Sequence, residues 1–234
     1  DISIKNDYLF ADSMMDLVVL DISDINNIEQ VNRLENVLYN NVFFPIEADL
    51  FEYEDYDYDT EIVIGWETTT ERRLKSEVEQ KNGGFVVMDG LAASESANGV
   101  TGQGGSLARF KIVDQFLYAV DSHNINVFDI SDLDNPKDLE DVFAGFDIET
   151  IFNQGNYLFL GSMRGMYIYD ITTPASPTFV SEFQHGTACD PVVVDGNYAY
   201  VTLRGGNMCG ATESGLFIVD ITNIESPELA ESYP

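Results

Sequence analysis

The chain has 234 residues, of which 44% are hydrophobic and 12% aromatic, so it can bury the core of one large domain. Its 41 acidic and 11 basic residues give a formal net charge of −30, which would repel phosphate backbones and anionic lipid surfaces. We therefore expect no nucleic-acid partner and no direct membrane insertion. Because the chain starts at Asp1 rather than at a methionine, we expect that a leader was removed or that the sequence is a fragment.

One short apolar segment that ends in Asp-Ile-Ser or Asp-Ile-Thr is written four times along the chain. An aromatic run precedes each copy, and it starts 13 residues before the Asp in three copies and 22 before it in the fourth. Nine extra residues inside one loop explain that difference. The apolar segments are residues 17–23, 125–131, 166–172 and 216–222, and the aromatic runs are residues 8–11, 116–119, 157–160 and 198–201.

Each repeat predicts a unit of four antiparallel strands. An extended segment precedes the aromatic run, for example residues 148–152 or 191–194, and turns of the type Gly-Asn join the two. A fourth extended run follows the Asp, for example residues 178–183. Repeats of this length that are made of short apolar strands are typical of propeller blades, so we predict an all-β fold, a β-propeller of four-stranded blades. We expect the four Asp residues to cap turns rather than to bind metal or to catalyse a reaction.

The segments at residues 216–220 (LFIVD) and 17–21 (LVVLD) resemble the LVIVD repeat, a β-propeller repeat of bacterial secreted and cell-surface proteins. The resemblance covers residues 1 to about 42 and 106–234. It implies a propeller, export and frequent anchoring at the outer membrane or cell surface, and it implies no activity, because the repeat itself carries no catalytic set. Four blades are few for a propeller, so we expect a partial or divergent one.

We therefore expect a single propeller domain over residues 1–234 with one long insertion. The expected repeats are residues 1–42, 106–143, 148–183 and 190–232, and the expected insertion is residues 43–105. Two extended runs inside the insertion, residues 61–66 and 84–89, could form a projecting hairpin or a degenerate blade.

Tyrosine and acidic residues alternate within the insertion, at residues 52–59. We interpret this stretch as a solvated acidic loop. The alternatives are a set of oxygen ligands for Ca²⁺ or a Tyr-rich contact surface, although the spacing lacks the Gly and the terminal Glu of an EF-hand loop. No other cofactor is expected.

Histidine and arginine residues occur in several of the loops that an antiparallel meander places at one end of the sheets. His123, Arg164 and Arg204 lie between second and third strands, and His185 lies between two blades. We expect these four residues to form a ligand site for a carboxylate, such as a sugar acid or an acidic peptide. The alternative is that they are ordinary polar loop residues.

The chain contains two cysteines, Cys189 and Cys209, which the meander places at that same end. We predict a disulfide between them, because the strand order allows a suitable separation and an exported protein meets an oxidising compartment. Two unlinked thiols are the alternative.

Enzyme motifs are missing from the sequence: it has no phosphate-binding glycine loop, nucleophile elbow or His-x-x-x-His pair. We expect a non-enzymatic, exported propeller that acts as a protein-binding or scaffold module in a bacterial cell-surface assembly. Its expected partners are other cell-surface or outer-membrane proteins, or a glycan. The alternative is a carbohydrate-binding propeller or a propeller-type polysaccharide lyase or hydrolase.

Overall fold

The chain divides into two compact units, and all the strands that the structure describes lie in the first. The first unit is Asp1–Asn40 with Gly104–Pro234, and the second is Asn41–Gln103. No helix long and apolar enough to cross a membrane occurs in the part of the chain that the structure describes. The computed structural model describes residues 1–38, 57, 60–61, 66–74, 109–146, 148–162, 164–184, 191–203 and 215–234.

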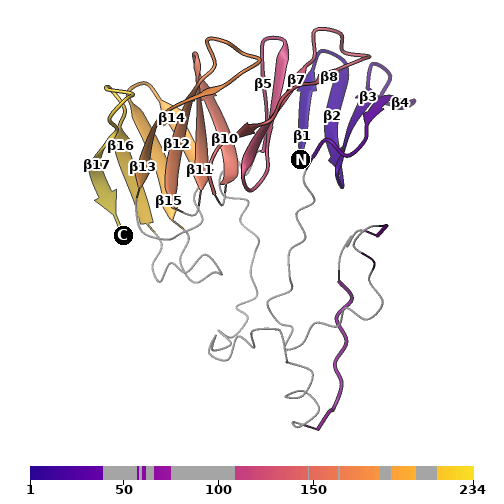
Figure 1. Cartoon of the computed structure of the whole chain (residues 1–234), viewed down its shortest axis with the longest axis horizontal. Coiled ribbons are helices and arrows are strands. Elements are labelled where there is room, and N and C mark those ends of the chain that lie inside the picture. Colours follow the sequence, from indigo (N-terminus) through magenta and orange to yellow (C-terminus); the bar gives the residue numbers. More distant parts are fainter. Residues whose placement is uncertain are drawn as a thin grey trace. The chain divides into compact units, whose positions relative to one another are not determined.

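These strands form four antiparallel sheets in which neighbouring strands follow chain order, except that β9 pairs with β7 (Figure 1). The described residues contain no helix, and the prediction of an all-β propeller built from four-stranded blades is confirmed. The first sheet has β1 (Ile2–Lys5), β2 (Tyr8–Ser13), β3 (Asp16–Asp21) and β4 (Glu29–Leu34). The second has β5 (Phe110–Val113), β6 (Phe116–Val120), β7 (Asn124–Asp129), β8 (Lys137–Asp138) and β9 (Val142–Phe143). The third has β10 (Ile148–Gln154), β11 (Tyr157–Ser162), β12 (Gly165–Asp170) and β13 (Thr178–Gln184), and the fourth has β14 (Val192–Asp195), β15 (Tyr198–Leu203), β16 (Gly215–Asp220) and β17 (Glu228–Tyr233).

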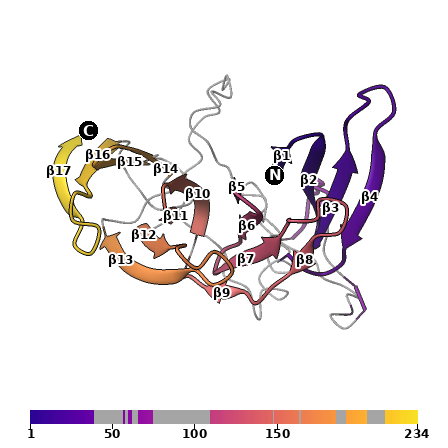
Figure 2. The ribbon, with the colours of Figure 1, turned by 90° about the horizontal axis from the view of Figure 1, so that it is seen from above.

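The sheets pack face to face, and an apolar cluster fills each of the three spaces between them. Phe10 and Leu117 belong to the cluster between the first two sheets, Tyr118 and Leu158 to the next, and Phe159 with Ala199 to the last. The first strands of neighbouring sheets contact one another, and Figure 2 shows the sheets fanning outward from these strands. Because both faces of the second and third sheets are covered, their third strands are buried at four of six positions each.

Strand register explains the constant spacing of the repeats. The first residue of each second strand pairs with the Asp that ends the third strand. The 13-residue spacing therefore fixes the length of one hairpin, and the longer loop of the fourth copy falls between Leu203 and Gly215, outside the described residues. The four pairs are Tyr8 with Asp21, Phe116 with Asp129, Tyr157 with Asp170 and Tyr198 with Asp220.

Each of these four Asp carboxylates caps the turn that follows its strand. The backbone N–H of the Ser or Thr two residues later donates to the carboxylate, at 2.8 Å for Asp21 and 2.6 Å for Asp170. The hydroxyl of Thr172 and then its backbone N–H hold the pKa of Asp170 below its usual range. For Asp21 the backbone N–H of Ser23 is the larger cause and the serine hydroxyl the second. The expected capping role is thus present in the structure.

We expect Asp170→Asn to lower the free energy of unfolding at neutral pH, because an amide oxygen accepts these two hydrogen bonds less strongly than a carboxylate. The folded-state pKa of Asp170 is depressed, so its contribution is present above the ordinary value of 3.8 and is lost as the pH falls through the folded-state pKa. Urea unfolding of both proteins should give a gap in unfolding free energy that is constant above about pH 5 and narrows as the pH falls further. Asp7→Asn removes the same charge from an exposed turn and serves as the control; a gap independent of pH would contradict the prediction.

The repeat predicts that Val19, Val127, Ile168 and Ile218 are equivalent and buried, and one of these four positions differs. Val19, Val127 and Ile168 are fully buried, and Ile218 occupies the same register opposite the third residue of its second strand. The expectation that Ile218 is buried as well is wrong, because it is only partly buried. Its face of the fourth sheet has no further sheet packed on it among the described residues.

Candidate binding site at the loop end of the sheets

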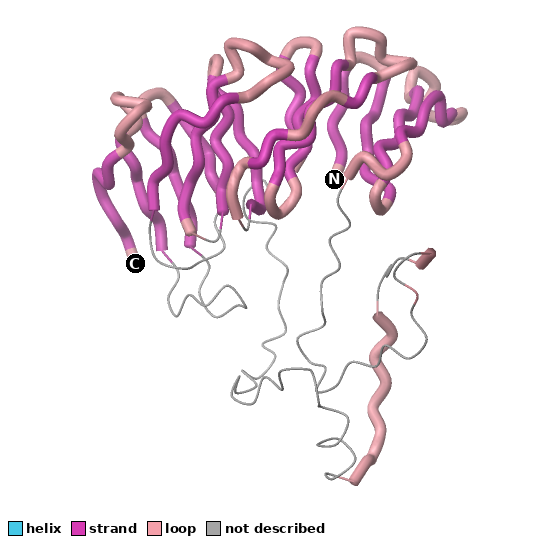
Figure 3. The backbone as a smooth tube through the Cα atoms, viewed as in Figure 1, coloured by secondary structure: helices cyan, strands magenta, loops and turns pink. Residues whose placement is uncertain are grey.

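The turns between second and third strands lie at the end of the sheets where β1 begins and β17 ends, which we call the loop end (Figure 3). Residues on either side of the long intervening segment also lie here. The backbone N–H of Leu38 donates to the carbonyl of Met15 at 2.8 Å, and that of Val120 donates to the carbonyl of Arg109 at 2.9 Å. The chain therefore leaves the first sheet and enters the second at the same end.

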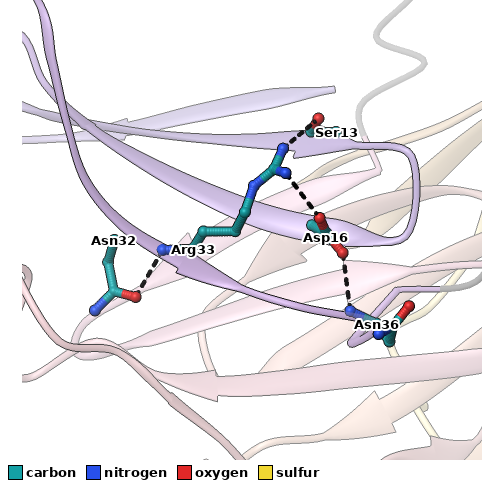
Figure 4. A network of polar contacts seen from close by, with 5 residues as sticks. All are labelled: Ser13, Asp16, Asn32, Arg33 and Asn36. Carbon is teal, nitrogen blue, oxygen red and sulfur yellow. Dashed lines mark hydrogen bonds and ion pairs between the residues drawn. The ribbon is translucent and has the colours of Figure 1, made fainter.

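A polar network orders the chain where it leaves the first sheet (Figure 4). The Arg33 guanidinium lies 3.1 Å from the carboxylate of Asp16 and donates to the hydroxyl of Ser13 at 2.8 Å. The same carboxylate accepts the backbone N–H of Asn36 at 2.9 Å. An exposed ion pair of this kind adds little to stability, but it fixes the β2–β3 turn relative to the end of β4.

Three rings form an exposed cluster at the loop end of the second sheet, and we call His123, Phe143 and Phe146 the aromatic patch. The Phe146 ring lies edge-on to His123 and to Phe143, each at 5.6 Å between ring centroids. Phe143 is 60% exposed and Phe146 is 51% exposed. Two neighbouring phenyl rings in water are costly, so the patch is a candidate contact surface.

Backbone hydrogen bonds hold the aromatic patch in place. Phe143 pairs with Asn124 at the end of β9, and the backbone N–H of Ala144 donates to the carbonyl of His123 at 2.7 Å. Gly145 has φ +137, and a Cβ at this position would lie 2.8 Å from the ring of Tyr167. The connection to the third sheet therefore passes directly over the packed ring of Tyr167, and the side chains of Phe143 and Phe146 are left exposed.

A buried carboxylate supports the turn beneath the patch. Asp121 accepts the backbone N–H groups of His123 at 2.6 Å and of Asn124 at 2.7 Å. Burial raises the pKa of Asp141, and the charges of Asp138 and Asp121 raise it further. The surroundings of the patch are therefore acidic.

Comparison with known proteins identifies the repeat. The model of the LVIVD repeat matches residues 1–32, 149–184 and 185–234, together about half of the chain. The chain belongs to the LVIVD-repeat family. The second sheet lies outside these matches, yet it has the strand order and register of the other three LVIVD blades.

No curated protein matches the chain by sequence. Among solved structures, it is similar to one chain of a complex from S. cerevisiae in which a mutant Dbp5 is bound to Nup159, a mutant Gle1, IP6 and ADP. The two chains are 9% identical, with a TM-score of 0.47. The similarity covers 98% of this chain and 46% of the yeast chain.

Two of the four predicted ligand residues are described, and both lie in turns at the loop end of neighbouring LVIVD blades. His123 lies in the β6–β7 turn, and Arg164 lies in the β11–β12 turn, where its backbone N–H donates to the Ser162 hydroxyl at 3.2 Å. His185 and Arg204 lie outside the described residues, so the cationic cluster stays a prediction. The predicted disulfide partners Cys189 and Cys209 also lie outside them.

The calcium alternative concerned the acidic stretch at residues 52–59, of which the structure describes Asp57 alone. The Asp57 carboxylate accepts the hydroxyl of Thr60 at 2.7 Å. Among the described residues, no three His, Cys, Asp or Glu side chains are grouped to hold a metal ion. Calcium binding by the acidic stretch itself stays untested.

Phe143 and Phe146 were not predicted as site residues. Sequence reasoning ended the second repeat at residue 143 and treated the following residues as a connection. Two phenylalanines within residues 143–146, where the second repeat ends and the connection begins, were the available signal in such an acidic chain.

Proposed function

We propose that this LVIVD-repeat chain is a non-enzymatic, exported β-propeller that binds a partner protein at its loop end, as a scaffold module of a bacterial cell-surface assembly. The aromatic patch carries the proposal. Aromatic residues are enriched at the centres of protein interfaces, where they supply much of the binding free energy. Because the patch is held by strand pairing and backbone hydrogen bonds, it loses little conformational freedom on binding.

Charge supports a basic partner segment. The carboxylates of Asp121, Asp138 and Asp141 lie close enough together for two of them to raise the pKa of the third. The chain as a whole carries a formal net charge of −30. A partner surface with an apolar side chain flanked by Lys or Arg would match this combination and would be steered toward it at low ionic strength.

Export and a location at the cell surface are part of the proposal because the resemblance to the repeat family implies both. The assignment as a non-enzyme rests on the sequence, because the repeat carries no catalytic set. A partner among cell-surface or outer-membrane proteins follows from that location.

The double variant Phe143→Ser, Phe146→Ser is expected to weaken partner binding by about tenfold or more, since truncated interface anchors typically cost above 1 kcal/mol each. The immobilised chain would be incubated with cell-envelope extract, and each retained protein would be quantified by mass spectrometry. Phe179→Ser is the matched control, because Phe179 is similarly exposed, lies on β13 and contacts the ring of Tyr169 rather than the rings of the patch. Proteins retained equally by wild type and double variant would contradict a binding role for the patch.

A glycan is the second candidate ligand. Exposed rings beside carboxylates also offer an apolar face and hydrogen-bond acceptors to a sugar ring. A glycan array read with the same three proteins separates the candidates: a sugar bound by wild type and by Phe179→Ser, but not by the double variant, would replace the protein partner.

A further inference from the structure

One face of the first sheet is apolar and exposed, whereas the equivalent face of each of the other three sheets is buried. We call this the head face, and it carries Ile2, Ile4, Leu9 and, from the turn after β3, Ile25. Ile2 pairs with the fourth residue of its second strand and is 63% exposed. The residues in the same register of the other sheets are Phe110, Ile151 and Val192, and they are 6%, 4% and 2% exposed.

Ile25 is a second residue of the first sheet that is exposed although its equivalents are packed. It follows the capping Asp21 by four residues and is exposed. Its equivalents Leu133 and Ile224 pack into the apolar clusters between neighbouring sheets. The first sheet thus has the side chains that a preceding sheet would cover, rather than the polar outer face of a terminal repeat.

The fourth sheet presents the complementary surface. We call it the tail face, a row formed by Val193, Tyr200 and Ile218 with Leu216 beside it. Val193 is 40% exposed, and Tyr200, Leu216 and Ile218 are only partly buried. In the other sheets the two central positions of this row are fully buried, for example Phe159 with Ile168.

Polar contacts at the internal junctions show how such faces meet. The Ser181 hydroxyl of the third sheet donates to the carbonyl of Ile224 in the fourth at 2.6 Å. The Asn32 amide of the first sheet donates to the carbonyl of Asp134 in the second at 2.8 Å. On the tail face Glu231 occupies the position of Ser181, opposite Ile218. A carboxylate cannot donate to the carbonyl of a docked turn, so the proposed contact depends on the apolar rows and does not repeat this hydrogen bond.

We propose that the head face of one copy of the chain packs on the tail face of a second copy, and that two copies close a ring that contains the eight sheets of their described residues. The contact repeats the apolar packing that joins neighbouring sheets at the three junctions within each chain. A head-to-tail contact between two copies closes a ring only if the copies are related by a half turn, and otherwise it continues as an open filament. Figure 2 shows the four sheets fanning outward on one side of their first strands, which leaves the other side to a second copy related by a twofold rotation.

Sedimentation velocity at about 50 μM protein in about 0.5 M NaCl tests the proposal, since this salt screens the repulsion between two strongly acidic chains. We expect wild type to sediment as a dimer. Ile4→Asp on the head face and Val193→Asp on the tail face should each weaken self-association by about 100-fold or more, because every junction would then bury a charge. Both residues are exposed in the single chain, so the variants should fold, and unchanged far-UV circular dichroism checks this.

Mixing the two variants identifies the head-to-tail geometry. A mixed dimer has one junction free of substitutions, so equal amounts of Ile4→Asp and Val193→Asp should regain dimer that neither forms alone. Phe179→Asp, an exposed substitution outside both faces, should leave the dimer unchanged. A monomeric wild type, a mass above that of a dimer, or a dimer unaffected by either variant would overturn the proposal.

Discussion

Truncating Ile168 to alanine is expected to lower the free energy of unfolding by about 2–5 kcal/mol, because the side chain is fully buried between the third and fourth sheets. The equivalent truncation at Ile218 should cost clearly less in the monomer. Ile218 has the same register within its own sheet, but its outer side keeps part of its contact with water. The difference between the two losses therefore measures the contribution of a packed neighbouring sheet.

Urea unfolding followed by far-UV circular dichroism checks this at low micromolar protein concentration, with equal denaturant slopes as the condition for comparing the variants. Equal losses at the two positions would contradict the assignment of Ile218 to an uncovered face. In a head-to-tail pair, the loss at Ile218 should also grow with protein concentration, whereas the loss at Ile168 should stay constant.

The register of the blades could be predicted from the sequence because it depends on local geometry. A hairpin with a fixed number of residues between its first aromatic residue and Asp21 or Asp170 places the same pairs opposite one another in each copy. The capping of the next turn is local as well, since the carboxylate and its donor are two residues apart. Such short-range patterns can be recognised in the sequence because they do not depend on the rest of the fold.

The exposure of Ile218 could not be predicted in the same way. Its segment is as apolar as those around Val19 and Ile168, and burial depends on whether another sheet packs on that face. The repeat pattern describes one blade and contains no information on which blades have neighbours. This is also why the head and tail faces became visible only in the structure.

The aromatic patch was missed for a different reason. The fourth strand of the second sheet is split into β8 and β9, and the pairing of β9 with β7 carries Phe143 and the following residues across the β6–β7 turn. That interruption falls within a blade outside the family matches, where the pattern of the other copies gives no guide. The prediction that His123 lies at the loop end needed only the order of the strands, whereas its contact with Phe146 needed the path of the connection.

Replacing Gly165 by alanine is expected to destabilise the chain by about 2–5 kcal/mol, the sum of a strained backbone and an overlap. Gly165 starts β12 with φ +147, which side-chain-bearing residues rarely adopt, and a Cβ there would lie 1.9 Å from the carbonyl oxygen of Phe183. That oxygen belongs to the paired strand β13 and cannot rotate away, so the two strands must separate at the loop end.

Gly155→Ala is the matched control, because Gly155 has φ +57 and no atom within 4 Å of the added Cβ. Its cost should be only about 1–2 kcal/mol, from the left-handed backbone alone. Thermal and urea unfolding of the two variants would show the difference. Equal losses would mean that the third blade relaxes at its loop end without cost, and the turn that carries Arg164 would then be too loosely held to position a ligand.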